Sequence, residues 1–196
     1  MKKSKVLLTL MCAVALVVTS VFGTLAYLTS TDEVVNTFTV GKVVITLDEL
    51  DVDDSDKDGN TNERDKANAY HLLPGHEYVK DPTVHVDADS ESCYVFVKVE
   101  NGIAGIEAEG NNTIAKQIAA KGWTALDGQT GVYYKTWTKG SANTDLVVFE
   151  KFQIAGTATN DTIKAYLDKE IKVTAYAIQM DGIADAAAAW TAYGNK

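Results

Sequence analysis

The chain is 196 residues long, 46% of them hydrophobic, and its 27 acidic and 18 basic residues give a net charge of −9. Because such an acidic surface repels the phosphates of nucleic acids and of anionic lipid headgroups, neither is expected as a partner. The length and apolar content are those of one ordinary domain with a sizeable core.

The first 26 residues have the pattern of a secretory signal peptide. Three lysines within the first five residues precede an apolar run at residues 6–22, and small residues follow at Thr24 and Ala26. We therefore predict cleavage between Ala26 and Tyr27 and export of the chain. The alternative is an uncleaved anchor, since a run of about 17 apolar residues is at the lower limit for spanning a bilayer.

Residues 27–196 are expected to form a single domain without a disulfide bond. They carry all 27 acids but lack the three lysines of the signal, so their net charge is −12. Cys12 would leave with the signal, and Cys93 then has no partner within the chain. Cys93 alternates with valines in the sequence, so we expect a small buried side chain on the apolar face of a strand.

Alternating β-branched and aromatic residues predict a mainly β protein. Both faces of residues 93–100 are largely apolar, which is typical of a strand covered on both sides. We predict an antiparallel two-sheet, jelly-roll-like sandwich with a few short connecting helices. The expected strands are 34–40, 42–47, 83–87, 93–100, 131–138, 145–154 and 170–179, and the expected helices are 113–121, a short run from Asn160-Asp161, and 183–193.

An acidic surface loop is expected at residues 48–66, between two apolar segments. Its sequence DSDKDG matches the beginning of a calcium-binding loop, in which alternate carboxylates converge on one hard cation. The twelfth position, where a bidentate Glu is usual, holds the shorter Asp65. The alternative is a solvated acidic loop that binds no metal. The candidate calcium ligands are Asp54, Asp56, Asp58, Asn60 and Asp65.

No catalytic constellation is recognisable, so we do not expect an enzyme. The histidines His71, His76 and His85 do not form a zinc-protease motif. His85 alternates with valines and is expected on the surface of a strand, and Cys93 among valines is a poor nucleophile because burial raises the pKa of a thiol.

Two blocks of sequence resemble the TasA/camelysin family of biofilm matrix proteins, whose members carry a SipW-type signal peptide. The first block is GTLAYLT at 23–29 running into NTFTVG at 36–41. The second is LPG at 73–75, KDPTV at 80–84 and CYVFVKV at 93–99. The resemblance implies a jelly-roll sandwich, cleavage by a dedicated signal peptidase, and extracellular fibres built by strand exchange. Camelysin was classed as a metalloprotease, but this chain has no matching zinc motif.

Residues 34–40 are β-prone, uncharged and free of proline, which is the composition of a strand that adds to an exposed sheet edge. After signal cleavage they would insert into a neighbouring subunit, with Val34, Phe38 and Val40 filling pockets. The alternative is pairing within the same sandwich.

The leading hypothesis is therefore a structural subunit of extracellular matrix fibres, secreted by a Gram-positive-type bacterium, whose main partner is another copy of itself. The alternatives are a monomeric secreted module that binds a cell surface, stabilised by calcium, and a camelysin-like metalloprotease. The membrane is involved through the signal peptide before its cleavage.

Overall fold

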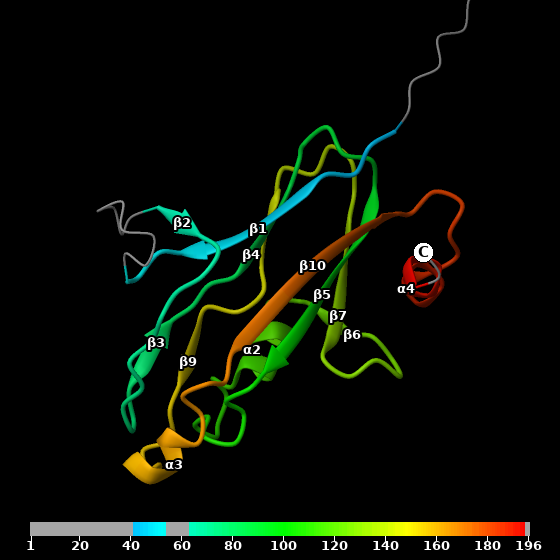
Figure 1. The fold of residues 1–196 in the computed structure, drawn as a ribbon. Coiled ribbons are helices and arrows are strands. Elements are labelled where there is room, and N and C mark those ends of the chain that lie inside the picture. Colours follow the sequence, from blue (N-terminus) through cyan, green and yellow to red (C-terminus); the bar gives the residue numbers. More distant parts are fainter. Residues whose placement is uncertain (1–40, 54–62, 195–196) are drawn as a thin grey trace, which may run out of the picture. The chain divides into compact units, whose positions relative to one another are not determined.

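The computed structural model describes residues 41–53 and 63–194 (Figure 1). They belong to one compact unit, Gly41–Lys196. The predicted signal peptide, its cleavage point and the predicted strand 34–40 lie outside the described residues. The elements are β1 (Ile45–Leu50), β2 (Arg64–Asp65), β3 (Glu77–Val79), β4 (Thr83–Val86), β5 (Cys93–Asn101), α2 (Ile114–Ala120), β6 (Thr124–Ala125), β7 (Val132–Trp137), β8 (Asp145–Val147), β9 (Lys151–Gln153), α3 (Asn160–Lys164), β10 (Ile171–Gln179) and α4 (Ala186–Gly194).

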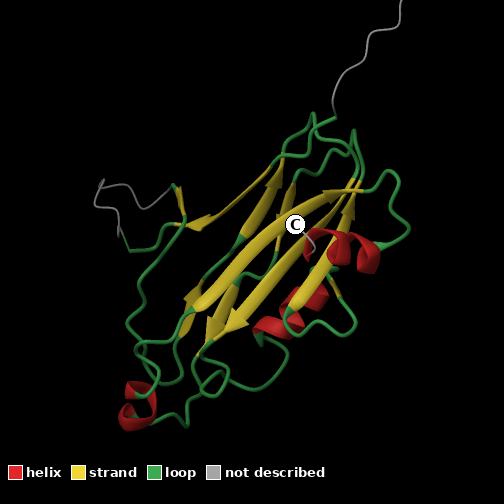
Figure 2. Cartoon of the chain, turned by 45° about the vertical axis from the view of Figure 1, so that its right-hand side comes forward, coloured by secondary structure: helices red, strands yellow, loops and turns green. Residues whose placement is uncertain are grey.

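The strands form antiparallel sheets, so the predicted mainly β sandwich is confirmed. One four-stranded sheet has the order β2-β1-β4-β8 and the other has the order β10-β5-β7-β6, while β3 and β9 form a separate pair. The longest pairing joins β5 to β10 over nine residues, from Cys93 opposite Gln179 to Asn101 opposite Ile171. Short helices lie in the connections, as the sequence predicts (Figure 2).

The main core lies between the two four-stranded sheets. Alternate residues of β5, from Cys93 to Val99, pack with Val84 and Val86 of β4 and with Leu146 of β8. Burying each such valine or leucine contributes about 1.5–3 kcal/mol. Cys93 is fully buried, as predicted, and burial raises the pKa of its thiol to about 11.

The opposite face of β5 is also buried, but a helix covers it. Tyr94 and Phe96 pack in a second apolar cluster with Ala186 and Ala189 of α4, and Trp190 lies against Phe96 with 5.2 Å between ring centroids. The prediction that both faces of this strand are covered is confirmed, and the second cover is α4, which lies beside the sheet in Figure 2.

The predicted single strand at 145–154 divides into β8 and β9, which belong to different sheets. Val148 and Phe149 are both fully buried, so the alternation of a strand breaks between them. Val148 N–H donates to Pro82 O, and Glu150 O accepts from Lys80 N–H, which carries the chain from one sheet to the other. The partner strand β3 was not predicted, because its three residues alternate too briefly to be recognised.

Strand β1 begins and ends later than predicted. Residues 42–44 bond to the turn before β5 instead of to β4: Lys42 O accepts from Glu91 N–H, and Val44 N–H donates to the Ser90 hydroxyl. The strand then continues through Asp48 to Leu50, so the first residues of the predicted acidic loop are part of the sheet. Within the described part of the chain, no helix is both long enough and apolar enough to cross a membrane.

Candidate functional site

A groove of about 900 Å³ opens between β1 of one four-stranded sheet and β10, an edge strand of the other. It is lined by Ile45–Glu49 of β1 on one side and by Ile171–Ala175 of β10 on the other. The last four residues of β10 do not line it, so the groove occupies the first half of that strand. In Figure 1 these two strands lie next to each other, one from each sheet.

Apolar side chains form about half of the groove lining, beside charged and polar residues of the same segments. Ile103 and Phe152 are buried at its base, and half-buried apolar side chains from the surrounding segments pack onto the same core. Leu167 stands at the rim with 64% of its surface exposed. The apolar lining residues are Ile45, Leu47, Ala67, Ala69, Tyr70, Leu72, Pro82, Ile103, Phe152, Tyr166, Leu167, Ile171, Val173 and Ala175.

Both strands that border the groove present a backbone edge to it. Strand β1 pairs with β4 through Ile45–Asp48, and within the described residues its other side pairs only with β2, at Glu49 and Leu50. Strand β10 pairs with β5 along its full length, and no other strand of the described residues pairs with it. An unpaired edge of this kind is a template for another strand. The groove thus combines two strand edges with an apolar floor.

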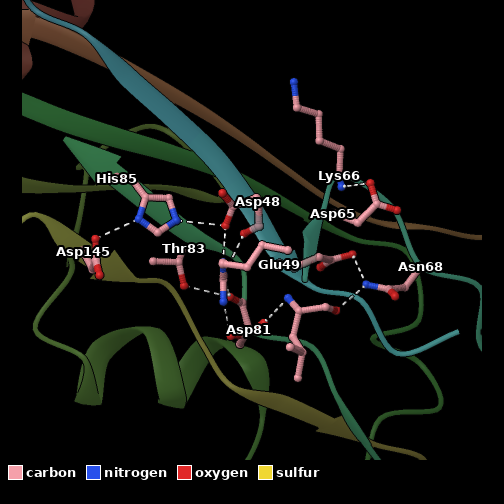
Figure 3. Close-up of polar contacts among 11 residues, drawn as sticks. Asp48, Glu49, Asp65, Lys66, Asn68, Asp81, Thr83, His85 and Asp145 are labelled. Carbon is pink, nitrogen blue, oxygen red and sulfur yellow. Dashed lines mark hydrogen bonds and ion pairs between the residues drawn. The ribbon is translucent and has the colours of Figure 1, made fainter. Parts of the chain in front are cut away.

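A buried charged pair closes one end of the groove. Lys80 Nζ lies 2.5 Å from Glu49 Oε2, and the two side chains are 10% and 6% exposed. Asn68 Nδ2 donates to the second oxygen of Glu49 at 3.0 Å and also to Leu50 O (Figure 3). Buried charges of this kind are stable only when paired and hydrogen-bonded. This pair requires both partners and fixes the segment after β3 against the end of β1, while Asn68 fixes the segment after β2 there.

A second polar network crosses the outer face of the β2-β1-β4-β8 sheet. His85 of β4 bonds with Nε2 to Asp48 of β1 at 2.9 Å and with Nδ1 to Asp145 next to it at 2.8 Å (Figure 3). The Arg64 guanidinium bonds to Asp48 and, at 2.9 Å, to Asp81. Strands β1, β2, β4 and β8 and the turn before β4 are therefore joined by one set of charges.

These contacts shift the pKa values of the network. Partial burial disfavours the charged form of His85, but hydrogen bonds from its ring to Asp145 and Asp48 outweigh this and raise its pKa above the ordinary value. Burial likewise opposes ionisation of Asp48, and hydrogen bonds from Arg64 and His85 outweigh it, so the pKa of Asp48 is lowered. The three groups stabilise one another's charged forms.

Most of the site residues predicted from the sequence lie outside the described residues. Of the candidate calcium ligands, Asp54, Asp56, Asp58 and Asn60 lie outside the described residues, as do Val34, Phe38 and Val40 of the predicted inserting strand. Asp65 lies in β2 opposite Glu49, and its carboxylate accepts from Lys66 N–H. In the part of the chain that the structure describes, no three His, Cys, Asp or Glu side chains are grouped to hold a metal ion.

The groove itself was not predicted from the sequence. Its walls come from β1, from residues 66–72, and from β10, which are far apart in the chain and have no shared motif. His85 does lie on the outer face of its strand as expected, but its two carboxylate partners are 37 and 60 residues away. No family model, curated protein or solved structure matches this chain.

Proposed function

We propose that this chain is a secreted structural subunit of extracellular matrix fibres of the TasA/camelysin type, and that the groove between β1 and β10 accepts a β-strand from another copy. The observation that supports the proposal is that, within the described residues, β10 and most of β1 each have one backbone edge without a partner strand where they border the groove. A strand placed there gains backbone hydrogen bonds from an edge and buries alternate side chains against the core.

The proposed occupant is the segment 34–40 of a neighbouring copy. With side chains alternating along a strand, Val34, Phe38 and Val40 share one face and are suited to the apolar floor. The groove is lined by five residues on each strand, which corresponds to about 17 Å of extended chain,. Seven residues are long enough to fill it.

The chain next to this segment favours exchange over self-pairing. Lys42 and Val44 are held in an extended path by their bonds to Glu91, Ser90 and Asp87. A strand that returned into its own groove beside β1 would have to reverse direction before Lys42. That turn would use part of residues 34–41 and shorten the strand left to fill the groove.

Electron microscopy tests the proposal directly. Protein consisting of residues 27–196 is incubated at rising concentration and imaged by negative stain beside protein that begins at Gly41. Fibres from the longer protein and none from the shorter one are expected. If both remain monomeric over a range of pH and calcium concentration, the fibre proposal fails.

A peptide experiment then identifies the occupant. A synthetic peptide of residues 27–40 should bind the protein that begins at Gly41, while a peptide with the same residues in scrambled order should not. Because side-chain pockets select the sequence of an added strand, equal binding of both peptides would contradict the assignment.

A monomeric binding module is the second candidate, and the size of the groove favours it. A volume of about 900 Å³ falls within the range of small-molecule sites,. In that case the protein of residues 27–196 would remain monomeric, and the peptide of residues 27–40 would not bind.

A further inference from the structure

Three side chains that meet at the end of the groove have complementary reactivity. Lys80 carries an amine, Asn68 a carboxamide and Glu49 a carboxylate that contacts both, with one oxygen 2.5 Å from Lys80 Nζ and the other 3.0 Å from Asn68 Nδ2. They come from the segment after β3, the segment after β2, and β1. One carboxylate therefore holds the two nitrogens beside each other.

We propose that Lys80 and Asn68 form an intramolecular isopeptide bond, with Glu49 transferring the proton. This inference is independent of the fibre proposal, because it depends on these three side chains and not on what occupies the groove.

The reaction is balanced without any other reactant. Glu49 takes a proton from the Lys80 ammonium, and the free amine attacks Cγ of Asn68 to form the new N–C bond. Glu49 then gives this proton to Nδ2 as the Cγ–Nδ2 bond breaks, and the second proton of the attacking nitrogen passes to the departing ammonia, which leaves as ammonium. No oxidation occurs, and Glu49 ends unchanged, as a general acid and base does.

The surroundings support this chemistry. Asn68 Oδ1 accepts from Val52 N–H at 2.8 Å, so the carbonyl that receives negative charge during attack already has a donor,. The Tyr70 ring lies 5.8 Å from Lys80 Nζ and helps to shield it. The Lys80 and Glu49 side chains are 10% and 6% exposed, and this burial strengthens the interaction between them,.

Other lysine–carboxylate pairs of the described residues lack these conditions. Lys139 with Glu91 and Lys151 with Glu77 have side chains between 36% and 53% exposed. In neither pair does the carboxylate have a recorded hydrogen bond to a side-chain amide. Among the described residues, Lys80 is the lysine whose buried carboxylate partner, Glu49, also bonds to a side-chain amide, that of Asn68.

Peptide mapping of the full chain tests the bond. Residues 67–80 contain no lysine or arginine before Lys80, and residues 81–98 contain none before Lys98. Trypsin cannot cleave after a lysine whose amine is in an amide. The bond therefore predicts one peptide, 67–98, lighter than its sequence by one ammonia molecule, and loss of the peptide 67–80.

The variants separate this bond from other events. Lys80→Arg keeps the charge but removes the amine, and Glu49→Gln keeps the size but removes the proton carrier; both should restore the full mass and cleavage at position 80. Lys66→Arg, at a nearby lysine outside the triad, should retain the lighter peptide.

Two outcomes would overturn the proposal. One is a wild-type chain of full mass that is cleaved after Lys80. The other is loss of ammonia with normal cleavage after Lys80, which indicates cyclisation of Asn68 onto its own backbone. Because mass is measured on denatured protein, a variant with lowered stability still gives an answer.

Discussion

The two sides of the sandwich, where the edges of its sheets come together, are closed in different ways. On the β7–β8 side, the ring of Trp123 fills the space, is 4% exposed, and donates from Nε1 to Val147 O at 2.8 Å. Helix α2 adds Ile114 and Ile118 to the same core. On the β1–β10 side, the described chain supplies no equivalent, and a groove of about 900 Å³ is left.

The difference indicates that the β7–β8 side is complete within one chain, whereas the β1–β10 side can accept a further strand. On the closed side, helix α2 is hydrogen-bonded to the neighbouring chain. Its Gln117 side chain donates to Lys151 O and accepts from Glu150 N–H. The open side has two strand edges with apolar residues beneath them. Closing it with a further strand would satisfy the exposed backbone groups and bury the half-exposed floor.

The largest expected loss of stability comes from removing the side chain that fills the closed side. Trp123→Ala removes a buried ring and a hydrogen bond, and should lower the free energy of unfolding by about 3–5 kcal/mol. Denaturant titration followed by circular dichroism measures it. Trp123→Phe keeps a ring and loses the bond to Val147, so its loss should be smaller. Equal losses would show that the hydrogen bond, and not the packing, closes this side.

A charge placed in the open side should block assembly with little loss of stability. Val173→Lys puts a long side chain at the middle of the groove, where its amine can extend into solvent, and an inward-facing charge prevents strand addition. Binding of the 27–40 peptide should weaken by about tenfold or more, equivalent to about 1.4 kcal/mol.

The control for this variant is Gln179→Lys, on the same strand but outside the groove. It should leave peptide binding unchanged. If Gln179→Lys weakens binding as much as Val173→Lys does, the peptide binds elsewhere and the open side is not its site.

The contrast between the two sides also marks the limit of what the sequence predicts. Strands β4, β5, β7 and β10 were predicted because their side chains alternate over four or more residues, and this pattern is local. The Glu49–Lys80–Asn68 cluster depends on segments 12–31 residues apart, and the groove depends on β1 and β10, which are more than 120 residues apart; neither set has a common sequence pattern. Likewise, burial of Val148 next to Phe149 reflects a change of sheet, which alternation within one strand cannot indicate.

A smaller effect on the free energy of unfolding, which depends on pH, is expected from the His85–Asp48–Arg64 network. This network holds β1 to the rest of its sheet. The raised pKa of His85 in the folded chain means that protonated His85 stabilises the fold below its unfolded pKa, and that this stabilisation is lost as pH rises through the folded pKa,. Since the network is partly exposed, the loss between about pH 6 and pH 9 should be about 1 kcal/mol or less.

His85→Gln should remove this part of the pH dependence. The charges that face His85 are Asp48 and Asp145, with Arg64 bonded to Asp48. Urea titrations of both proteins at the two pH values measure the difference. An unchanged slope with pH in the variant would show that another group is responsible.

The smallest effect on stability is expected at the rim of the groove, and there assembly and stability should separate most clearly. Leu167 is 64% exposed, so Leu167→Ser should change the free energy of unfolding by no more than about 0.5 kcal/mol,. If an added strand covers this side chain, the same substitution should weaken binding of the 27–40 peptide by about fivefold, since burying part of a leucine contributes about 1 kcal/mol.

Leu73→Ser is the matched control, because Leu73 is 47% exposed and does not line the groove. If Leu167→Ser weakens peptide binding and Leu73→Ser does not, the added strand covers the groove. If both variants bind the peptide equally well, the groove remains open in the functional state.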